Sequence, residues 1–230
     1  MTDLERLRHP RAIFLDIGGP IYDDENFVVA VSRALDELRA DRRLPPVPAN
    51  DLRPIYDAMR NRQGGSIRGE LARRFLGDAS LRDELSDRTK QYWMHPTGTL
   101  MPDVVPFLKA VDHRAVIGVV ANQEAGVVDD LKRDGVARFI TVWGVSALVG
   151  IEKPSPEIFA WALDAVGVDA REAVHIGNRL DTDVRPARAV GLGTVWLMRG
   201  EAPAQPTAEQ RAEPDLAVES LAGLDRLLFP

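Results

Sequence analysis

Short, continuous runs of apolar residues recur along the chain and alternate with segments of helical periodicity. Continuous rather than alternating apolar runs predict strands that are buried on both faces, as in parallel sheets. Alternation of such strands with helices predicts an α/β fold, a doubly wound (Rossmann-like) parallel sheet. The predicted strands span 12–16, 115–121, 139–143, 173–177 and 193–198, and a last strand at 216–220 precedes a helix at 221–229.

The helices between these strands have recognisable ends. A helix over 155–167 begins with Ser155 as its cap and Pro156 at its first position, and a glycine ends it. Further helices are predicted over 127–133 and 182–191. The polar, proline-bearing stretch at 199–215 is predicted to be a surface connection.

The segment 24–96 breaks the strand–helix alternation. Its apolar residues repeat at spacings of three and four throughout, which predicts helices and no strand. We therefore expect a helical insertion, the cap domain, over 24–96, and an α/β core domain made of 1–23 and 97–230.

The composition and charge of the chain limit the binding partners and the cellular compartment that we expect for the protein. The net charge of −6 gives no reason to expect nucleic acid or an anionic membrane as partner. The chain has no cysteine, which excludes disulfides and a thiol nucleophile. The N-terminal residues are charged, and no apolar run reaches membrane-spanning length, so a cytoplasmic protein is expected.

Polar groups follow the predicted strands at the edge where a doubly wound sheet binds ligands. They are Asp16, Asn122, Lys153, Asn178 and the acids Asp181 and Asp183. A carboxylate facing a lysine can hold and attack a phosphoryl group or ligate a divalent cation. The alternative is a structural cluster of salt bridges.

Three stretches carry a resemblance to a known family. Asp16 begins a strand–Asp-x-x-Gly-x-Ile motif, "KPSPEIF" starts at Lys153, and "HIGNRLDTDVRPARAVGL" starts at His175. In order and surroundings they resemble the haloacid dehalogenase-like (HAD) hydrolase superfamily, and the insertion lies where that superfamily places its C1-type cap.

The resemblance implies a hydrolase of the phosphatase type that acts on a small phosphorylated, anionic substrate. It implies that Asp16 is the nucleophile and that Lys153 offsets charge beside it. It further implies Mg²⁺, held by Asp16, the carbonyl of Gly18, Asn178 and Asp183.

The sequence departs from the family pattern at functional positions. Gly18 stands where the phosphatases carry a second aspartate as general acid and base, and Pro20 replaces a threonine or valine. Ala121 replaces a hydroxyl donor, and Asn178 replaces an acidic metal ligand. General acid–base assistance is worth about 10² to 10⁴ in rate and one preorganised donor about 10² to 10³, so weakened or altered catalysis is expected.

Three interpretations follow from these departures. The protein is a phosphatase for substrates with a good leaving group, or one that uses another acid: Tyr22, Asp23, His175 or Asp181. Alternatively it is a non-catalytic relative that binds a ligand or a protein. A 2-haloacid dehalogenase is less favoured, because that branch usually has an aromatic residue at the position of Gly18 and a serine at that of Ala121.

Substrate contacts are predicted from both domains. Asn122 follows the second strand of the core. In the insertion, the turn 60–68 offers Arg62 and Arg68 around two glycines, and arginine suits an anionic substrate. A solvated loop between helices is the alternative for this turn. Either a monomer or a homodimer is compatible with the sequence.

Overall fold

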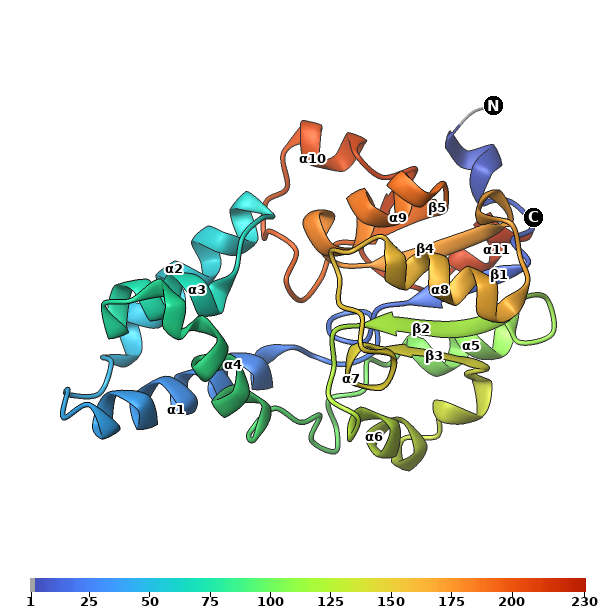
Figure 1. Cartoon of the computed structure of the whole chain (residues 1–230). Coiled ribbons are helices and arrows are strands. Elements are labelled where there is room, and N and C mark those ends of the chain that lie inside the picture. The colour runs from blue at the N-terminus through green and yellow to red at the C-terminus, as the bar shows by residue number, and fades with distance from the viewer. Residues whose placement is uncertain (1–2) are drawn as a thin grey trace. The chain divides into compact units, whose positions relative to one another are not determined.

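The computed structural model describes residues 3–230, which form two compact units (Figure 1). The core unit comprises the chain up to Asp23 together with His95–Pro230, and the insertion unit is Asp24–Met94.

The core unit is built on one six-stranded sheet in which every neighbouring pair is parallel. The strand order is β3-β2-β1-β4-β5-β6, so β1 lies between β2 and β4. Ile13 of β1 pairs with Ile117 on one side and Val174 on the other. The strands are β1 (Ala12–Leu15), β2 (Val116–Ala121), β3 (Val142–Val145), β4 (Ala173–Gly177), β5 (Gly193–Leu197) and β6 (Leu216–Val218).

Helices cover both faces of this sheet (Figure 1). Alternate residues of β1 point to opposite faces: Ile13 and Leu15 join the cluster that contains Leu108 and Leu131, and Phe14 joins the cluster that contains Phe159 and Ala187. This confirms the predicted Rossmann-like α/β fold. The helices are α5 (Val104–Val111), α6 (Val127–Arg133), α7 (Ser146–Val149), α8 (Glu157–Val166), α9 (Arg185–Val190), α10 (Ala208–Ala212) and α11 (Leu224–Leu228).

Local structure differs from the sequence-based expectation in three places. The third strand begins at Val142 rather than at 139, because Phe139 closes a 3₁₀ turn through a bond from its N–H to the carbonyl of Val136 (3.0 Å). The helix predicted from 182 begins earlier, as a π-helical turn over Leu180–Val184. The connection after β5 contains the short helix α10, which a capping box between Thr207 and Gln210 starts.

The insertion unit is helical, as its periodicity predicts. It contains α1 (Glu25–Asp41), α2 (Ala49–Arg62), α3 (Ile67–Leu71) and α4 (Arg82–Lys90), with a π-helical turn at Ala72–Leu76. Leu35, Leu38, Leu71 and Leu85 are fully buried in a core of its own.

Within residues 3–230, none of the helices combines the length and the apolar character that crossing a bilayer requires.

Candidate active site

Asp16 lies at the carboxyl edge of the sheet, directly after the central strand β1. Its N–H donates to the carbonyl of Ile176 in β4 (2.9 Å), which fixes the main chain here. The Asp16 side chain is 14% exposed, so its carboxylate is accessible although it ends a buried strand.

Lys153 comes from the segment between β3 and α8, and its side chain is almost completely buried. Its Nζ lies 2.8 Å from Oδ1 of Asp16 and 2.5 Å from Oδ1 of Asp183. Asn122, directly after β2, holds the main chain of Lys153: Nδ2 of Asn122 donates to the Lys153 carbonyl and Oδ1 accepts its N–H, both at 2.8 Å. The side chain predicted to contact substrate is thus engaged in positioning the lysine.

Asp183, in the π-helical turn after β4, is fully buried behind Lys153. Its Oδ1 also contacts Nε2 of His175 (3.1 Å), and its Oδ2 accepts the N–H of Arg179 (2.9 Å). Gly177 makes room for this carboxylate, since a Cβ there would lie 2.3 Å from Cγ of Asp183. The contacts to Lys153, His175 and the N–H of Arg179 thus engage both oxygens of Asp183, which the resemblance implies as a metal ligand.

The three charges share one buried site and shift one another's pKa values. Burial raises the pKa of Asp16 to about 7; the Lys153 ammonium opposes this rise, and the charge of Asp183 adds to it. Burial also disfavours the charged form of Asp183, but Lys153 and the bond from His175 outweigh it and hold the pKa of Asp183 below its usual range. Desolvation disfavours charged Lys153 too, yet the two carboxylates raise its pKa. With both carboxylates ionised, the cluster carries one net negative charge.

That negative charge and the nearby oxygens fit a divalent cation. Asp16 offers a carboxylate, Gly18 a carbonyl, and Asn178, directly after β4, an amide oxygen; hard oxygens are the ligands that Mg²⁺ prefers. Nδ2 of Asn178 is directed to the carbonyl of Arg199 (3.3 Å). Among the described residues, no cluster of three or more His, Cys, Asp or Glu side chains could hold an ion, so such a site relies on the amide and the carbonyl.

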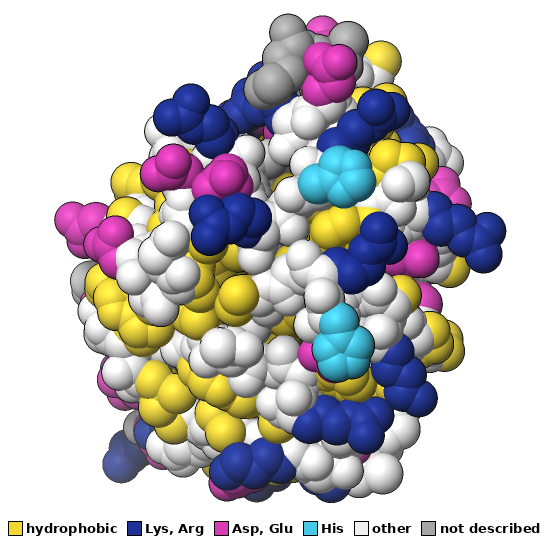
Figure 2. Space-filling view, turned by 90° about the vertical axis from the view of Figure 1, so that its right-hand side faces the viewer, with side chains coloured by type: hydrophobic (Ala, Val, Ile, Leu, Met, Phe, Trp, Pro, Cys, Tyr) yellow, Lys and Arg dark blue, Asp and Glu magenta, His cyan; other side chains and the backbone are white. Residues whose placement is uncertain are grey.

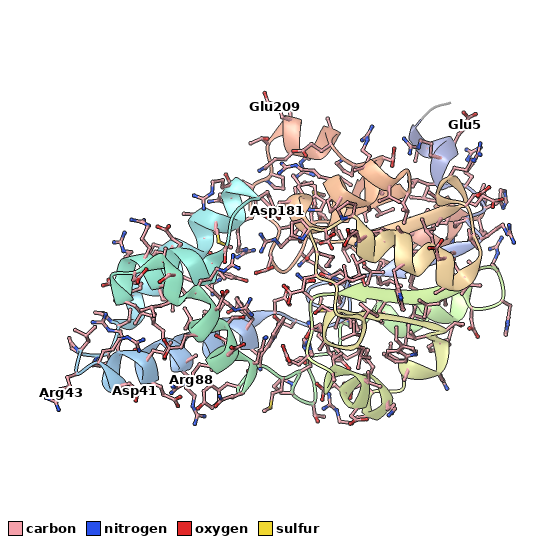
Figure 3. All side chains as sticks on the ribbon, in the orientation of Figure 1. Glu5, Asp41, Arg43, Arg88, Asp181 and Glu209 are labelled. Carbon is pink, nitrogen blue, oxygen red and sulfur yellow. The ribbon has the colours of Figure 1, made fainter. Side chains whose placement is uncertain are left out.

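The residues considered as replacement general acids lie in different environments. Three of them, Tyr22, Asp23 and Asp181, are not histidines. Tyr22 is fully buried, and its Oη donates to Oδ2 of Asp134 (2.9 Å); burial and this bond raise the pKa of Tyr22. Asp23 is exposed. The carboxylate of Asp181 accepts two hydrogen bonds from Arg179 (2.9 and 2.7 Å). The arrow of β2 in Figure 1 points to the carboxyl edge of the sheet, and Figure 3 shows Asp181 at that end of the core unit. Of the residues considered as replacement acids, Asp181 therefore combines a carboxyl group with partial exposure at this edge.

The histidines contribute no exposed acid or base to this edge. His175 is buried in β4, and burial lowers its pKa. His9 precedes β1 and His113 precedes β2, so they lie at the opposite, amino edge of the sheet. Figure 2 faces that side and shows exposed histidine side chains among those of Lys and Arg. The fourth histidine, His95, is buried.

The predicted substrate arginines have different settings within the insertion unit. Arg62 is exposed and lines a groove of about 610 Å³ together with Arg73 and Arg82. The guanidinium of Arg68 lies over the rings of Phe27 (5.1 Å) and Trp93 (5.8 Å), so this residue packs against aromatic side chains. Arg68 packs on aromatic rings, whereas Arg62 is exposed in the groove. Of the two, Arg62 is therefore better placed to bind an anion.

Arg199 is a residue of this edge that the sequence-based selection missed. Its guanidinium donates to the carbonyls of Gly19 (3.0 Å) and Pro20 (2.5 Å) and pairs with both oxygens of Asp103 (2.9 and 2.8 Å). It therefore fixes the turn that follows Asp16. The signal was available, because Arg199 follows a predicted strand and so belongs to the carboxyl edge of the sheet.

Parts of the chain are similar in sequence to known proteins. Residues 150–224 match the model of the family described as HAD-hydrolase-like. The chain is 36% identical over 128 residues to a phosphoserine phosphatase of Thermus thermophilus (53% of this chain, 48% of the relative). It is 37% identical over 102 residues to a glyceraldehyde 3-phosphate phosphatase of Methanopyrus kandleri (44% of each).

A solved structure agrees over nearly the whole chain. The HAD phosphatase from Thermococcus onnurineus superposes with a TM-score of 0.64 and 23% identity, covering 95% of this chain and 97% of that one. The chain therefore shares the α/β fold of this phosphatase, and its residues 150–224 are similar to the HAD-hydrolase-like family. It spans about half the length of the two curated phosphatases that it matches.

Proposed function

We propose that this protein hydrolyses a small phosphorylated substrate through an aspartyl-phosphate formed on Asp16. The observation that carries the proposal is the Asp16–Lys153 ion pair of 2.8 Å at the carboxyl edge of the sheet, backed by Asp183. The named activities of the phosphoserine and glyceraldehyde 3-phosphate phosphatases support a phosphomonoester or related anion as substrate.

In the proposed reaction, Lys153 contacts Oδ1 of Asp16, and we assign the attack on phosphorus to Oδ2. A bond forms between this oxygen and phosphorus, and the bond to the leaving oxygen breaks with its electron pair. Water then attacks the phosphorus of the acyl phosphate, and the bond between Oδ2 and phosphorus breaks with its electron pair on the carboxylate. The protons of the water leave with the orthophosphate and to solvent. The Lys153 ammonium offsets the negative charge of the transferring group throughout.

We further propose Mg²⁺ as the cofactor, held by Asp16, the carbonyl of Gly18 and the amide of Asn178. When bound, it would supply positive charge to the phosphoryl oxygens. Asp183, which the resemblance gives as a ligand, is better explained as the group that positions Lys153, because Lys153, His175 and the N–H of Arg179 contact its oxygens.

The glycine at position 18 shapes the substrate proposal. No side chain there can protonate a leaving oxygen, so we propose substrates whose leaving group departs without a proton, such as acyl or aryl phosphates. Asp181, partly exposed and held by Arg179, is the acid we propose for substrates that do need a proton.

The test is phosphate release from acetyl phosphate, an aryl phosphate and an alkyl phosphate, with and without Mg²⁺. Activity that Asp16→Asn reduces to background supports the proposal. Asp129→Asn, which changes an exposed carboxylate of α6 outside the ion pair, is the matched control and should leave the rate unchanged. No turnover by the wild type, together with stabilisation by phosphate, would instead identify a binding protein; halide release from 2-haloacids would identify a dehalogenase.

A further inference from the structure

The chain leaves the core unit for the insertion after Asp23 and re-enters it at His95, and the core ties these two points together. The N–H of Asp23 donates to the carbonyl of Thr99, and the N–H of Met101 donates to that of Ile21, both at 2.9 Å. The exit and re-entry segments thus form a short hydrogen-bonded pair.

Side chains join the same two points. The rings of Tyr22 and His95 stack with centroids 4.4 Å apart and planes inclined by 15°. Tyr22 is fully buried and His95 is 3% exposed. The exit and re-entry segments are therefore packed against each other in the interior of the core unit.

Helix α6 and the residue after it hold this aromatic pair in place. Asp134 accepts the Tyr22 hydroxyl (2.9 Å), and Asp130 accepts the N–H of His95 (3.2 Å). Arg133 donates to the carbonyl of His95 (2.8 Å) and pairs with both acids at 2.6 Å. We name Tyr22, His95, Asp130, Arg133 and Asp134 the linker clamp.

The clamp contacts the loop that holds Lys153. Nε2 of His95 lies 3.3 Å from Oε1 of Gln123, a buried residue. An amide oxygen accepts only, so His95 donates from Nε2, and the lowered pKa of this buried imidazole agrees with a neutral ring. The neighbouring residue, Asn122, makes the two hydrogen bonds to the main chain of Lys153.

Gln123 is also fixed by its own main chain. Its N–H donates to Oγ of Ser146 (3.1 Å), and its carbonyl lies 3.3 Å from the same hydroxyl. The side chain of Gln123 is therefore the part of this loop that faces the clamp, while Asn122 faces Lys153. His95 and Lys153 are thus connected through two consecutive residues, Gln123 and Asn122.

We propose that Gln123 is a positioning residue, through which the linker clamp holds Lys153 against Asp16. The inference rests on the proposed function, because it assigns Gln123 to the Asp16–Lys153 pair. The linker clamp lies at the point where the insertion joins the core. The proposal gives its residues a role in the reaction that does not involve contact with the reacting atoms.

Two variants break the same link from opposite sides. Gln123→Ala removes the acceptor, and His95→Phe removes the donor while keeping a ring to stack on Tyr22. Each should lower kcat for acetyl phosphate about tenfold, the value of one net hydrogen bond, with KM nearly unchanged. The double variant should lose no more than either single variant, because one link carries both effects.

Rescue and control variants separate positioning from stability. Gln123→Glu keeps an oxygen acceptor and should recover most of kcat. Leu228→Val shortens a fully buried side chain of α11, next to the carbonyl that accepts the N–H of His9 at the amino edge of the sheet, and should lower the melting temperature without lowering kcat. Additive losses in the double variant, no rescue by Glu, or equal loss in Leu228→Val would overturn the proposal.

Asp16→Asn in the same assay distinguishes the positioning role from the proposed function. If Asp16→Asn abolishes turnover while Gln123→Ala leaves kcat unchanged, the positioning role is wrong and the proposed function stands. If Asp16→Asn leaves the rate of phosphate release unchanged, or the wild type releases no phosphate, the proposed function fails and the role of Gln123 fails with it.

Discussion

At the scale of single residues, the position two residues after Asp16 decides which leaving groups the site can assist. Gly18 has no side chain to donate a proton, and the left-handed conformation of the turn belongs to Gly19, with φ of 81°. The backbone conformation at position 18 therefore does not require a glycine.

Gly18→Asp should restore a general acid. We expect kcat/KM for an alkyl phosphate to rise about 10² to 10⁴-fold, with little change for acetyl phosphate, whose carboxylate leaves without a proton. The ratio of the two substrates in a steady-state assay is the measurement. A similar rise for both would show that the new carboxylate acts in some other way, such as binding the metal.

Gly177 is required for a different reason, the space it leaves for Asp183. Gly177→Ala places a methyl group 2.3 Å from Cγ of Asp183, so the carboxylate must move and its contacts to Lys153 and His175 are lost. We expect a loss of roughly 3 to 5 kcal/mol in the free energy of unfolding, as for breaking a buried ion pair, and loss of turnover.

Chemical denaturation measures this loss. The control is Gly126→Ala, where an added Cβ meets nothing within 4 Å, and it should fold and react as the wild type. Equal stability of the two variants would show that Asp183 can be accommodated elsewhere.

At the scale of elements, two pairs of hydrogen bonds differ in what they join. Asn122 connects the end of β2 to the segment before α8 by two bonds in a partly buried setting. Thr207 and Gln210 make the two bonds of a capping box at the exposed start of α10.

Asn122→Ala should cost about 2 kcal/mol in the free energy of unfolding and lower kcat, because it leaves main-chain groups of Lys153 without partners. Thr207→Ala should cost about 1 kcal/mol or less and leave kcat unchanged. Urea denaturation and the acetyl phosphate assay compare the two variants. A larger cost at Thr207 would contradict the order expected from burial.

The elements also show what the sequence could and could not predict. The apolar runs predicted the sheet because both of its faces are covered, and Ile13 and Phe14 indeed point to opposite helical layers. The start of β3 was misplaced because the 3₁₀ turn at Phe139 reads as a continuation of the apolar run. Helix α10 was missed although Thr207 and Gln210 have capping-box spacing.

Within the site, the positions of the predicted strands explain why several site residues could be selected from the sequence. Asp16, Lys153 and Asp183 were selected because residues after parallel strands meet at one edge. Their pairing was not predictable: His175 and the N–H of Arg179 engage Asp183 through a π-helical turn, which has no clear sequence signal. The contact between His95 and Gln123 could not be predicted either, because it joins segments that are distant in the sequence.

At the scale of the whole molecule, the raised pKa of Asp16 makes stability depend on pH. Between its ordinary pKa of 3.8 and the value of about 7, the folded protein binds a proton that the unfolded chain does not. The free energy of unfolding therefore falls as pH rises through this window. Asp16→Asn removes the titrating carboxyl group, and with it this dependence of the free energy of unfolding on pH.

In the presence of EDTA, the melting temperature of Asp16→Asn should exceed that of the wild type by an amount that grows from about pH 5 to about pH 8. Mg²⁺ should stabilise the wild type more at the upper end of this range, since it favours the ionised carboxylate. Thermal unfolding measures both. Parallel curves for the two proteins would show that Asp16 does not titrate in this window.

The central place of β1 has a consequence for how the protein is made. Both neighbours of this strand, β2 and β4, follow the insertion, so roughly a hundred residues must be added after β1 before its first partner exists, which takes several seconds at typical rates of synthesis. Until then the apolar strand that ends at Asp16 has no sheet to join. The emerging chain thus exposes a strand that is fully buried in the folded protein, and this strand is where we expect chaperones to bind during translation.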